Sequence, residues 1–229
     1  QGEANILYRN LGNGTFTDSG QDLGIVYTLD ARDVALGDLD GDGDLDALVA
    51  RYGRSNVVFL NDGTGTMTLD QTLGSASSSG VALGDLDGDG DLDAFFANYH
   101  EGNRVWLNDG RGTFTASSES LGSSNGLDVA LGDLDGDGDL DAMVAAWPDQ
   151  ADKVWLNDGA GNFTATQQVI QARGGRIGHG RRFRNGHLFR SIAQERELAR
   201  KDAFLLHDQL VQSGRKNPDF RILEGVETG

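Results

Sequence analysis

An Asp-rich string repeated along the chain constrains its fold more than any other feature of the sequence. Gly-Asp-Leu-Asp-Gly-Asp-Gly-Asp-Leu-Asp-Ala occurs at residues 37–47, 84–94 and 132–142, and the first aspartates of successive copies are 47 and 48 residues apart. A second string, built around a Gly-x-Gly turn, follows each copy from Asn56, Asn103 and Asp152. A degenerate form of it begins at Asn5 without an Asp-rich partner, so we expect the fragment to begin in the middle of a repeat. Such a period is typical of repeat architectures whose units pack against their neighbours.

Each repeat predicts four short strands. In the first copy, strands over 34–39 and 45–51 flank the Asp-rich loop, and strands over 56–61 and 67–72 flank an Asn-Asp-Gly-Thr-Gly turn. Asn, Asp and Gly tolerate positive φ and therefore close hairpins. Short strands, frequent turns and the lack of helical periodicity indicate an all-β fold, and four strands in about 45–50 residues match a propeller blade. The sequence predicts a partial β-propeller of about three four-stranded blades plus a half blade.

Charge divides the chain into two segments. The 229 residues carry a net charge of −17, but residues 1–165 hold 29 acidic and 7 basic residues, whereas residues 166–229 hold 7 acidic and 12 basic residues. The net charges are therefore −22 and +5. We accordingly predict a repeat region over 1–165 and a basic tail over 166–229. The acidity of the repeats argues against a nucleic-acid binder, which needs clustered cations.

Other classes are excluded by composition. The chain has no cysteine, so it contains no disulfide, thiolate metal site or cysteine nucleophile. It has no apolar run of about 18 residues, so no transmembrane segment is predicted in this chain, and no signal peptide is predicted in this fragment.

The basic tail has three open interpretations, and we expect it to be irregular or partly helical. It could be a genuine extension, with a helix that begins at Ser191 and ends at Gln212. The cluster of Arg181, Arg182 and Arg184 could bind a membrane or a polyanion. The tail could also be a repeat read out of frame, because shifted codons permit a new Asp-rich loop whose first Asp lies 45 positions after Asp133. The encoding DNA would distinguish these interpretations.

The Asp-rich loops have the pattern of calcium sites. Carboxylates fall at loop positions 1, 3, 5, 7 and 9, with Gly at position 6 where the chain must turn sharply. Several hard oxygen ligands in a flexible loop suit Ca²⁺ better than Mg²⁺ or a transition metal. We expect side-chain ligands at positions 1, 3, 5 and 9 and a backbone carbonyl at position 7, giving about three Ca²⁺ sites. The predicted ligands are Asp38, Asp40, Asp42, Asp44 and Asp46; Asp85, Asp87, Asp89, Asp91 and Asp93; and Asp133, Asp135, Asp137, Asp139 and Asp141.

Two other interpretations of the Asp-rich loops compete with calcium sites. An EF-hand needs a Glu at position 12, where this chain has Val49, Phe96 or Val144, so that motif is excluded. A solvated acidic turn without metal is disfavoured because five carboxylates in nine residues repel one another.

Residues 5–165 resemble the FG-GAP/VCBS-type repeat of integrin α-subunit propellers, several lectins and many secreted bacterial proteins. The resemblance is carried by Asp-Val-Ala-Leu-Gly-Asp-Leu-Asp-Gly-Asp-Gly-Asp-Leu-Asp-Ala-Leu-Val-Ala followed by Asn-Asp-Gly-Thr-Gly-Thr-Met-Thr. It implies Ca²⁺ in the loop between the first two strands of each blade, and commonly a seven-bladed ring. This chain is shorter than such a ring and loses the pattern after Ala165.

Aromatic residues recur at two positions of the repeat. Tyr8, Phe59, Trp106 and Trp155 lie within the third strand, where packing between blades is expected. Tyr52, Tyr99 and Trp147 follow the second strand in a polar loop. These three residues either cover the blade edge or form a ligand-binding surface suited to stacking on sugar rings.

The sequence thus predicts a secreted or cell-surface module for adhesion or for binding a protein or glycan ligand. No enzymatic activity is expected, because the repeat region has a single histidine, His100, without a partnered serine nucleophile. Two alternatives remain, a non-catalytic accessory domain of a larger secreted enzyme and a structural spacer.

Overall fold

The computed structural model describes residues 6–23, 31–118, 120–147 and 150–166. All of them belong to one compact unit, Gln1–Ile177. The predicted helix and arginine cluster of the basic tail lie outside the described residues, so the interpretations of the tail stay open.

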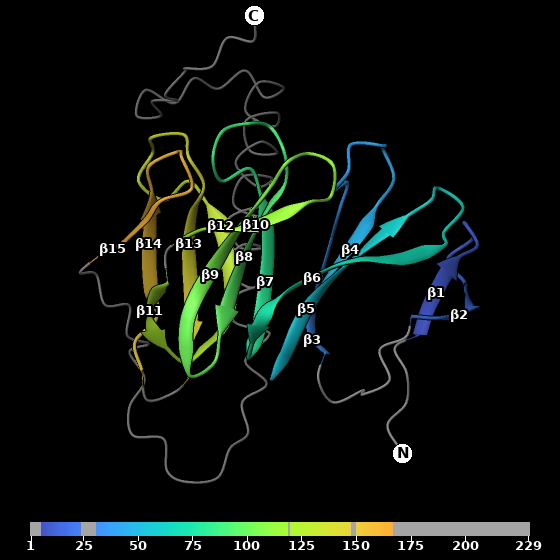
Figure 1. Ribbon diagram of the computed structural model, residues 1–229, viewed down its shortest axis with the longest axis horizontal. Coiled ribbons are helices and arrows are strands. Elements are labelled where there is room, and N and C mark those ends of the chain that lie inside the picture. Colours follow the sequence, from blue (N-terminus) through green and yellow to red (C-terminus); the bar gives the residue numbers. More distant parts are fainter. Residues whose placement is uncertain (1–5, 24–30, 119, 148–149, 167–229) are drawn as a thin grey trace, which may run out of the picture. The chain divides into compact units, whose positions relative to one another are not determined.

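The described residues form fifteen strands in four antiparallel sheets (Figure 1). The half blade consists of β1 (Ile6–Asn10) and β2 (Phe16–Asp22). Blade 1 consists of β3 (Ala31–Gly37), β4 (Asp46–Arg51), β5 (Arg54–Asn61) and β6 (Met67–Ala76). Blade 2 consists of β7 (Ser78–Gly84), β8 (Asp93–Asn98), β9 (Glu101–Asn108) and β10 (Phe114–Ala116), with β11 (Leu121–Ser124) also paired to β9. Blade 3 consists of β12 (Gly126–Gly132), β13 (Asp141–Ala146), β14 (Lys153–Asn157) and β15 (Phe163–Ala165).

The prediction of an all-β partial propeller with three blades and a half is confirmed. Each complete sheet is a meander in which strands consecutive in sequence are neighbours, and the part of the chain that is described contains no helix. Accordingly, no candidate membrane-spanning helix occurs in that part.

The register of the hairpins is the same in every blade. Gly37 lies opposite Asp46 at the start of the Asp-rich loop, and Gly84 and Gly132 lie opposite Asp93 and Asp141 in the same way. The first strand was predicted to continue to residue 39, but it ends at Gly37. It ends there because the Asp38 carboxylate accepts hydrogen bonds from two backbone N–H groups further along the chain, which turns the backbone into the loop.

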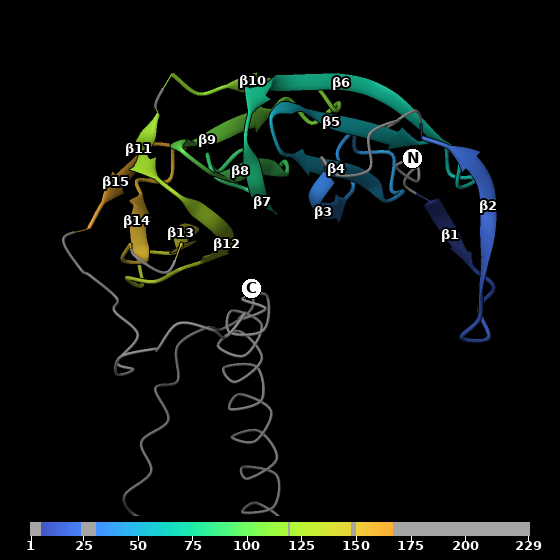
Figure 2. The same ribbon diagram turned by 90° about the horizontal axis from the view of Figure 1, so that it is seen from below.

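The hydrophobic core lies between successive blades. One cluster joins Leu48 and Val58 of blade 1 to Phe96 and Phe114 of blade 2. A second joins blades 2 and 3, where the Phe95 and Phe163 rings meet edge to face with centroids 5.3 Å apart. The first strands β3, β7 and β12 are neighbours in turn (Figure 2). Each sheet therefore covers a face of the next one, as a repeat whose units cannot bury both faces alone requires.

The third-strand aromatic residues pack between blades, with one exception. Trp106 of blade 2 lies against Gly74 of blade 1, and Trp155 of blade 3 lies against Gly122 of blade 2. The prediction is wrong for Tyr8, which is 56% exposed. In complete blades the third strand pairs with a second strand, whereas β1 pairs only with β2 among the described residues.

Candidate metal centre

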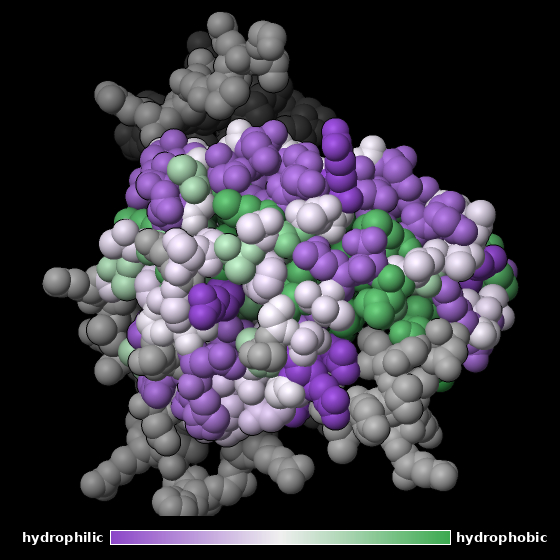
Figure 3. All heavy atoms as spheres, viewed as in Figure 1, coloured by the Kyte–Doolittle hydropathy of each residue, from purple (hydrophilic) through white to green (hydrophobic). Residues whose placement is uncertain are grey.

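Each Asp-rich loop connects the first two strands of a blade, and the three loops lie at the same end of their sheets, uppermost in Figure 1. The hydrophilic side chains along the upper edge of the surface coincide with this end (Figure 3). The loops are therefore accessible to an ion from solvent while their strands hold them in place.

The first aspartate of each loop organises the backbone. Asp85 Oδ1 accepts a hydrogen bond from Gly88 N–H at 2.8 Å, and its Oδ2 accepts one from Gly90 N–H at 3.1 Å. Asp38 makes the corresponding bonds in blade 1. The loop bends at Gly90, whose φ of 95° disfavours residues with a side chain. The sequence thus folds each loop locally through contacts that span only a few residues.

Three aspartates come together in each blade. One carboxylate oxygen from each residue lies within 4.8 Å of the others, which places them close enough to share an ion. The triads are Asp38, Asp40 and Asp42; Asp85, Asp87 and Asp93; and Asp133, Asp135 and Asp141.

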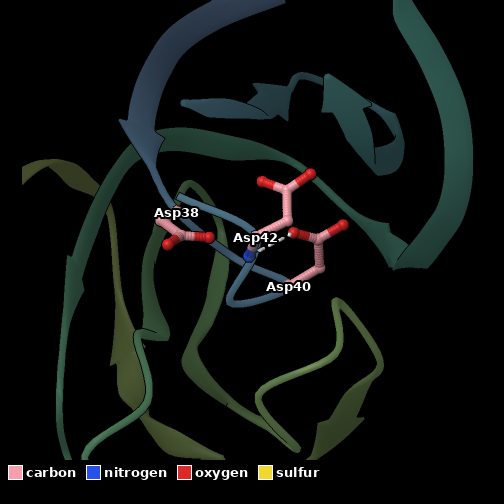
Figure 4. A group of neighbouring side chains, drawn as sticks. All are labelled: Asp38, Asp40 and Asp42. Atoms are coloured by element: carbon pink, nitrogen blue, oxygen red, sulfur yellow. Dashed lines mark hydrogen bonds between the residues drawn. The ribbon is translucent and has the colours of Figure 1, made fainter. Parts of the chain in front are cut away.

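The composition of the triads differs between blades. In the first triad the three side chains come from one loop, and the Asp42 N–H donates to Asp40 Oδ1 at 3.2 Å (Figure 4). Loop position 5 belongs to this triad in blade 1, whereas position 9 replaces it in blades 2 and 3. Six predicted ligands lie outside the triads. They are Asp46 at position 9, Asp89 and Asp137 at position 5, and Asp44, Asp91 and Asp139 at position 7.

The aspartate at position 9 is the anchor of the site. Asp46, Asp93 and Asp141 are fully buried. The two oxygens of Asp93 accept hydrogen bonds from Leu86 N–H in the loop and from Asn108 N–H at the end of the third strand, both at 2.8 Å. This carboxylate therefore ties the Asp-rich loop to the neighbouring turn within the same blade.

The aspartate at position 7 directs its side chain away from the triad. The Asp44 carboxylate packs against Gly63 in the turn between β5 and β6, where a Cβ would collide with it. Asp91 and Asp139 pack in the same way against Gly110 and Gly159. A side chain in this position does not join the cluster, so the backbone carbonyl is the group that this residue can offer to an ion.

Burial, together with the neighbouring carboxylates, raises the pKa of several aspartates in the loops. Burial raises the pKa of Asp93 to about 6, although hydrogen bonds from Asn108 and Leu86 oppose the shift. The pKa values of Asp40, Asp87 and Asp135, at position 3 of the loops, are also raised, first by desolvation and further by neighbouring carboxylates. A bound cation would reverse both effects because it stabilises the charged form.

The Asp-rich loops also form the junctions between blades, which sequence reasoning missed. Asn108 Nδ2 of blade 2 donates to the Leu39 carbonyl in the loop of blade 1 at 2.8 Å, and the Gly112 N–H donates to the same carbonyl at 2.8 Å. Asn157 of blade 3 donates likewise to Leu86 O of blade 2. The recurring Asn of the second repeated string was the only signal for this role.

The three aromatic residues that follow the second strands form a continuous group. The Tyr99 ring lies between those of Tyr52 and Trp147, with centroid distances of 6.0 and 5.9 Å. The Arg32 guanidinium lies 5.0 Å from the centroid of the Tyr52 ring. Tyr52 and Trp147 are exposed. The structure thus brings together all three predicted ligand-binding residues, in loops at the opposite ends of the second strands from the Asp-rich loops.

The donor set of the triads fits a hard cation. Every predicted side-chain ligand is a carboxylate, which hard cations prefer. Softer metals prefer cysteine and histidine, and the described part of the chain has no cysteine and a single histidine, His100, which is not in a triad. Fold and site together define a repeat protein of four-stranded blades in which each complete blade carries an Asp triad that could hold a metal ion.

Sequence comparison agrees with this class. The FG-GAP-like repeat matches residues 1–49, 38–96 and 85–144, which together span more than half of the chain. The chain belongs to the FG-GAP-like repeat family. No curated protein matches it.

Proposed function

We propose that the chain is a Ca²⁺-binding propeller module of a secreted or cell-surface protein that takes part in adhesion or ligand binding and has no catalytic activity of its own. The observation that carries the proposal is that each of the three complete blades gathers three aspartates of its Asp-rich loop into one cluster. Carboxylates brought this close repel one another, and a divalent cation removes the repulsion. Extracellular modules bind Ca²⁺ with Kd values of roughly 10⁻⁴ to 10⁻³ M, so such sites fill outside cells.

Chelation tests the metal. Ca²⁺ at 10 mM is about 10 to 100 times such a Kd, so each occupied site should stabilise the folded state by about 1.4 to 2.7 kcal/mol. Thermal melts in EDTA, in Ca²⁺ and in Mg²⁺ should give the highest Tm in Ca²⁺. Identical melts in all three conditions would overturn the assignment.

A matched pair of variants locates the sites. Asp87→Asn removes a triad carboxylate and should lower the number of Ca²⁺ ions bound, measured by titration calorimetry, by one. Asp70→Asn removes an exposed carboxylate of β6 outside the triads and should leave the number unchanged. Equal stoichiometry in the two variants would contradict the assignment of the site.

The aromatic group supports carbohydrate as the ligand class. Tyr52 and Trp147 are exposed, Tyr99 between them is half-buried, and the cationic Arg32 lies over the Tyr52 ring; such surfaces bind a sugar by stacking and polar contact. The double variant Tyr99→Ala, Trp147→Ala should lose glycan-array binding, whereas Leu69→Ala, at an exposed apolar residue of β6, should retain it. Circular dichroism would check that all variants fold.

The same arrays separate the remaining alternatives. A wild-type chain that binds neither glycans nor proteins would favour a structural spacer. A full-length gene with a catalytic domain beside the repeats would favour an accessory domain of a secreted enzyme.

A further inference from the structure

One asparagine at each junction between complete blades is hydrogen bonded to two consecutive Asp-rich loops. Asn157 Nδ2 donates to the carbonyl of Leu86 at 2.8 Å, which is position 2 of the loop of blade 2. The same group donates to the carbonyl of Leu140 at 3.2 Å, which is position 8 of the loop of blade 3. Asn157 is 5% exposed. A single buried amide therefore connects the loops of two different blades.

The backbone of this asparagine holds a triad carboxylate of its own blade. Asn157 N–H donates to Asp141 Oδ1 at 2.9 Å, and Asp141 is both fully buried and a member of the blade 3 triad. On the other side of the junction, Leu86 N–H donates to Asp93 Oδ2 at 2.8 Å, and Asp93 belongs to the blade 2 triad. A continuous run of short hydrogen bonds thus connects the two triads through Leu86 and Asn157.

The junction between blades 1 and 2 has the same bonds. Asn108 Nδ2 donates to the carbonyls of Leu39 and Leu92, at 2.8 and 3.3 Å. Asn108 N–H donates to Asp93 Oδ1 at 2.8 Å, and Leu39 N–H donates to Asp46 Oδ2 at 2.8 Å. Because Asp93 accepts bonds from both sides, the run continues through the position 9 carboxylates of all three complete blades.

The two asparagine amides depend on these loop carbonyls for their orientation. The Oδ1 atoms of Asn108 and Asn157 are buried and have no hydrogen-bond partner among the described residues. Asn61, at the same position in blade 1, differs from them. It donates to Leu45 O of its own blade at 3.2 Å, and its Oδ1 accepts Gly65 N–H at 3.1 Å. A loop that holds its carbonyl in place therefore orients Asn108 or Asn157, whereas the Asn61 amide is held within blade 1.

This arrangement makes the order of one loop depend on the order of its neighbour. A loop that adopts its ion-binding conformation fixes the carbonyl at position 2, which orients the asparagine of the next blade and, through it, the position 9 carboxylate there. Part of the entropy cost of ordering the second loop is then already met, which gives positive cooperativity. Repulsion between two bound cations acts in the opposite direction, so the sign of the coupling separates the two effects.

We propose that Asn108 and Asn157 couple the Asp-rich loops of neighbouring blades, so that Ca²⁺ bound in one loop raises the affinity of the next loop for Ca²⁺. Such coupling rests on the proposed function, because it concerns the regulation of the same three sites. Both asparagines are positioning residues rather than ligands, since their Nδ2 groups donate to the loops. Coupling between sites is reciprocal, so each loop affects its neighbour in both directions along the chain.

Variants with one or two active loops measure the coupling. Asp40→Asn removes a triad carboxylate of blade 1 and leaves the loops of blades 2 and 3, and a further Asp87→Asn or Asp135→Asn leaves only one of these. Calorimetric titration of the full chain with Ca²⁺ gives the overall binding constant of the two-loop variant. We expect it to exceed the product of the two one-loop constants by at least about fivefold, the lower end of typical coupling between sites. A two-loop constant equal to the product, or below it, would overturn the proposal.

A variant of the bridging asparagine tests its role. Asn157→Ala, added to the same three variants, should abolish the excess without changing any charge. Asn61→Ala is the matched control and should preserve the excess, because the Asn61 side chain bonds only within blade 1 among the described residues. Excess retained in Asn157→Ala, or lost equally in Asn61→Ala, would contradict the role given to Asn157. If Asn157→Ala does not fold, as judged by circular dichroism, Asn108→Ala in variants with Asp135→Asn asks the same question of blades 1 and 2.

Hydrogen exchange in EDTA provides a readout without the ion. Asn157→Ala should speed exchange of Leu86 N–H, which lies in the neighbouring blade and bonds to Asp93, whereas Asn61→Ala should leave it unchanged. Unchanged exchange of Leu86 N–H in Asn157→Ala would argue against the positioning role. In the titrations, a wild-type chain that binds no Ca²⁺ would refute the proposed function and the coupling together, whereas binding by independent loops would refute the coupling alone.

Discussion

Two glycines at the same repeat position allow the packing between blades to be tested. Gly84 and Gly132 both end the first strand of their blade, opposite Asp93 and Asp141. A Cβ on Gly84 would lie 2.6 Å from Leu140 Cδ1 and 3.2 Å from Leu131 Cδ1, whereas a Cβ on Gly132 would meet none of the described residues within 4 Å. Neither glycine has a positive φ, so alanine is compatible with both backbones.

The expected magnitude follows from this geometry. Replacing Gly by Ala at a compatible position stabilises a protein by about 0.4–1 kcal/mol, because the unfolded chain loses freedom. Overpacking a filled interface costs about 1–3 kcal/mol. Gly132→Ala should therefore be slightly stabilising, and Gly84→Ala should be less stable than Gly132→Ala by about 1–3 kcal/mol, which is the overpacking cost alone.

Urea unfolding and thermal melts in Ca²⁺ measure the difference. For a domain of this size, 1 kcal/mol shifts Tm by about 2–4 °C, so the two variants should differ by about 2–12 °C. Gly37→Ala should behave like Gly84→Ala, because Leu92 and Leu83 crowd it in the same way. Equal stability of Gly84→Ala and Gly132→Ala would refute the inference that leucines of one blade fill the glycine site of the blade before it.

Three further predictions concern the Asp-rich loops. Asp93→Asn leaves Leu86 N–H or Asn108 N–H without its acceptor. In EDTA this should lower the free energy of unfolding, measured with urea, by about 1–3 kcal/mol. Asp89→Asn, at an exposed residue, should lower it less. In EDTA the raised pKa of Asp93, about 6 against 3.8, means that its protonation stabilises the folded state fully below pH 3.8 and that this contribution is lost as pH rises through about 6. In EDTA the Tm should therefore fall more between pH 5 and pH 7 for wild type than for Asp93→Asn. In saturating Ca²⁺ the Tm of wild type should instead rise over this range, because the ion binds the charged carboxylate. Finally, the loop of blade 3, where Leu134 is 40% exposed, should bind Ca²⁺ more weakly than the loop of blade 2, where Leu86 is 1% exposed. Calorimetry should then show that Asp135→Asn removes a weaker binding step than Asp87→Asn does, and the reverse order would contradict this reasoning.

Much of the fold could be predicted because its signals are local. The second strand of blade 1 was expected over 45–51 and is found at Asp46–Arg51, and the third was expected over 56–61 and is found at Arg54–Asn61. The Asp and Gly residues that flank these strands interact with backbone groups only a few positions away. For example, the Asp38 carboxylate accepts hydrogen bonds from the N–H groups of Gly41 and Gly43. Three aspartates of each loop come together for the same reason, and the full set of predicted ligands stays a prediction.

The remaining features depend on residues far apart in sequence. Asn108 bonds to Leu39 across 69 positions and Asn157 to Leu86 across 71, and neither pairing has a local signature. Which carboxylates of a loop meet also varies, since position 9 joins the triad in blades 2 and 3 but not in blade 1. Tyr8 was expected to pack between blades and is exposed, because the third-strand aromatic residues pack against the preceding blade and no blade precedes β1 among the described residues.

The burial of one repeated leucine cannot be read from the sequence. This leucine is Leu39, Leu86 and Leu134 in the three blades. Each occupies the second position of an Asp-rich loop, and the repeat alone specified that loop, the strands on either side of it and the aspartates from which each triad is drawn. Leu39 and Leu86 are buried, whereas Leu134 is 40% exposed, although the three residues are identical in type and in local sequence. Only the tertiary structure decided this difference, because burial depends on which blade packs against a residue. Blade 2 packs against Leu39 and blade 3 against Leu86, whereas no described blade packs in this way against Leu134.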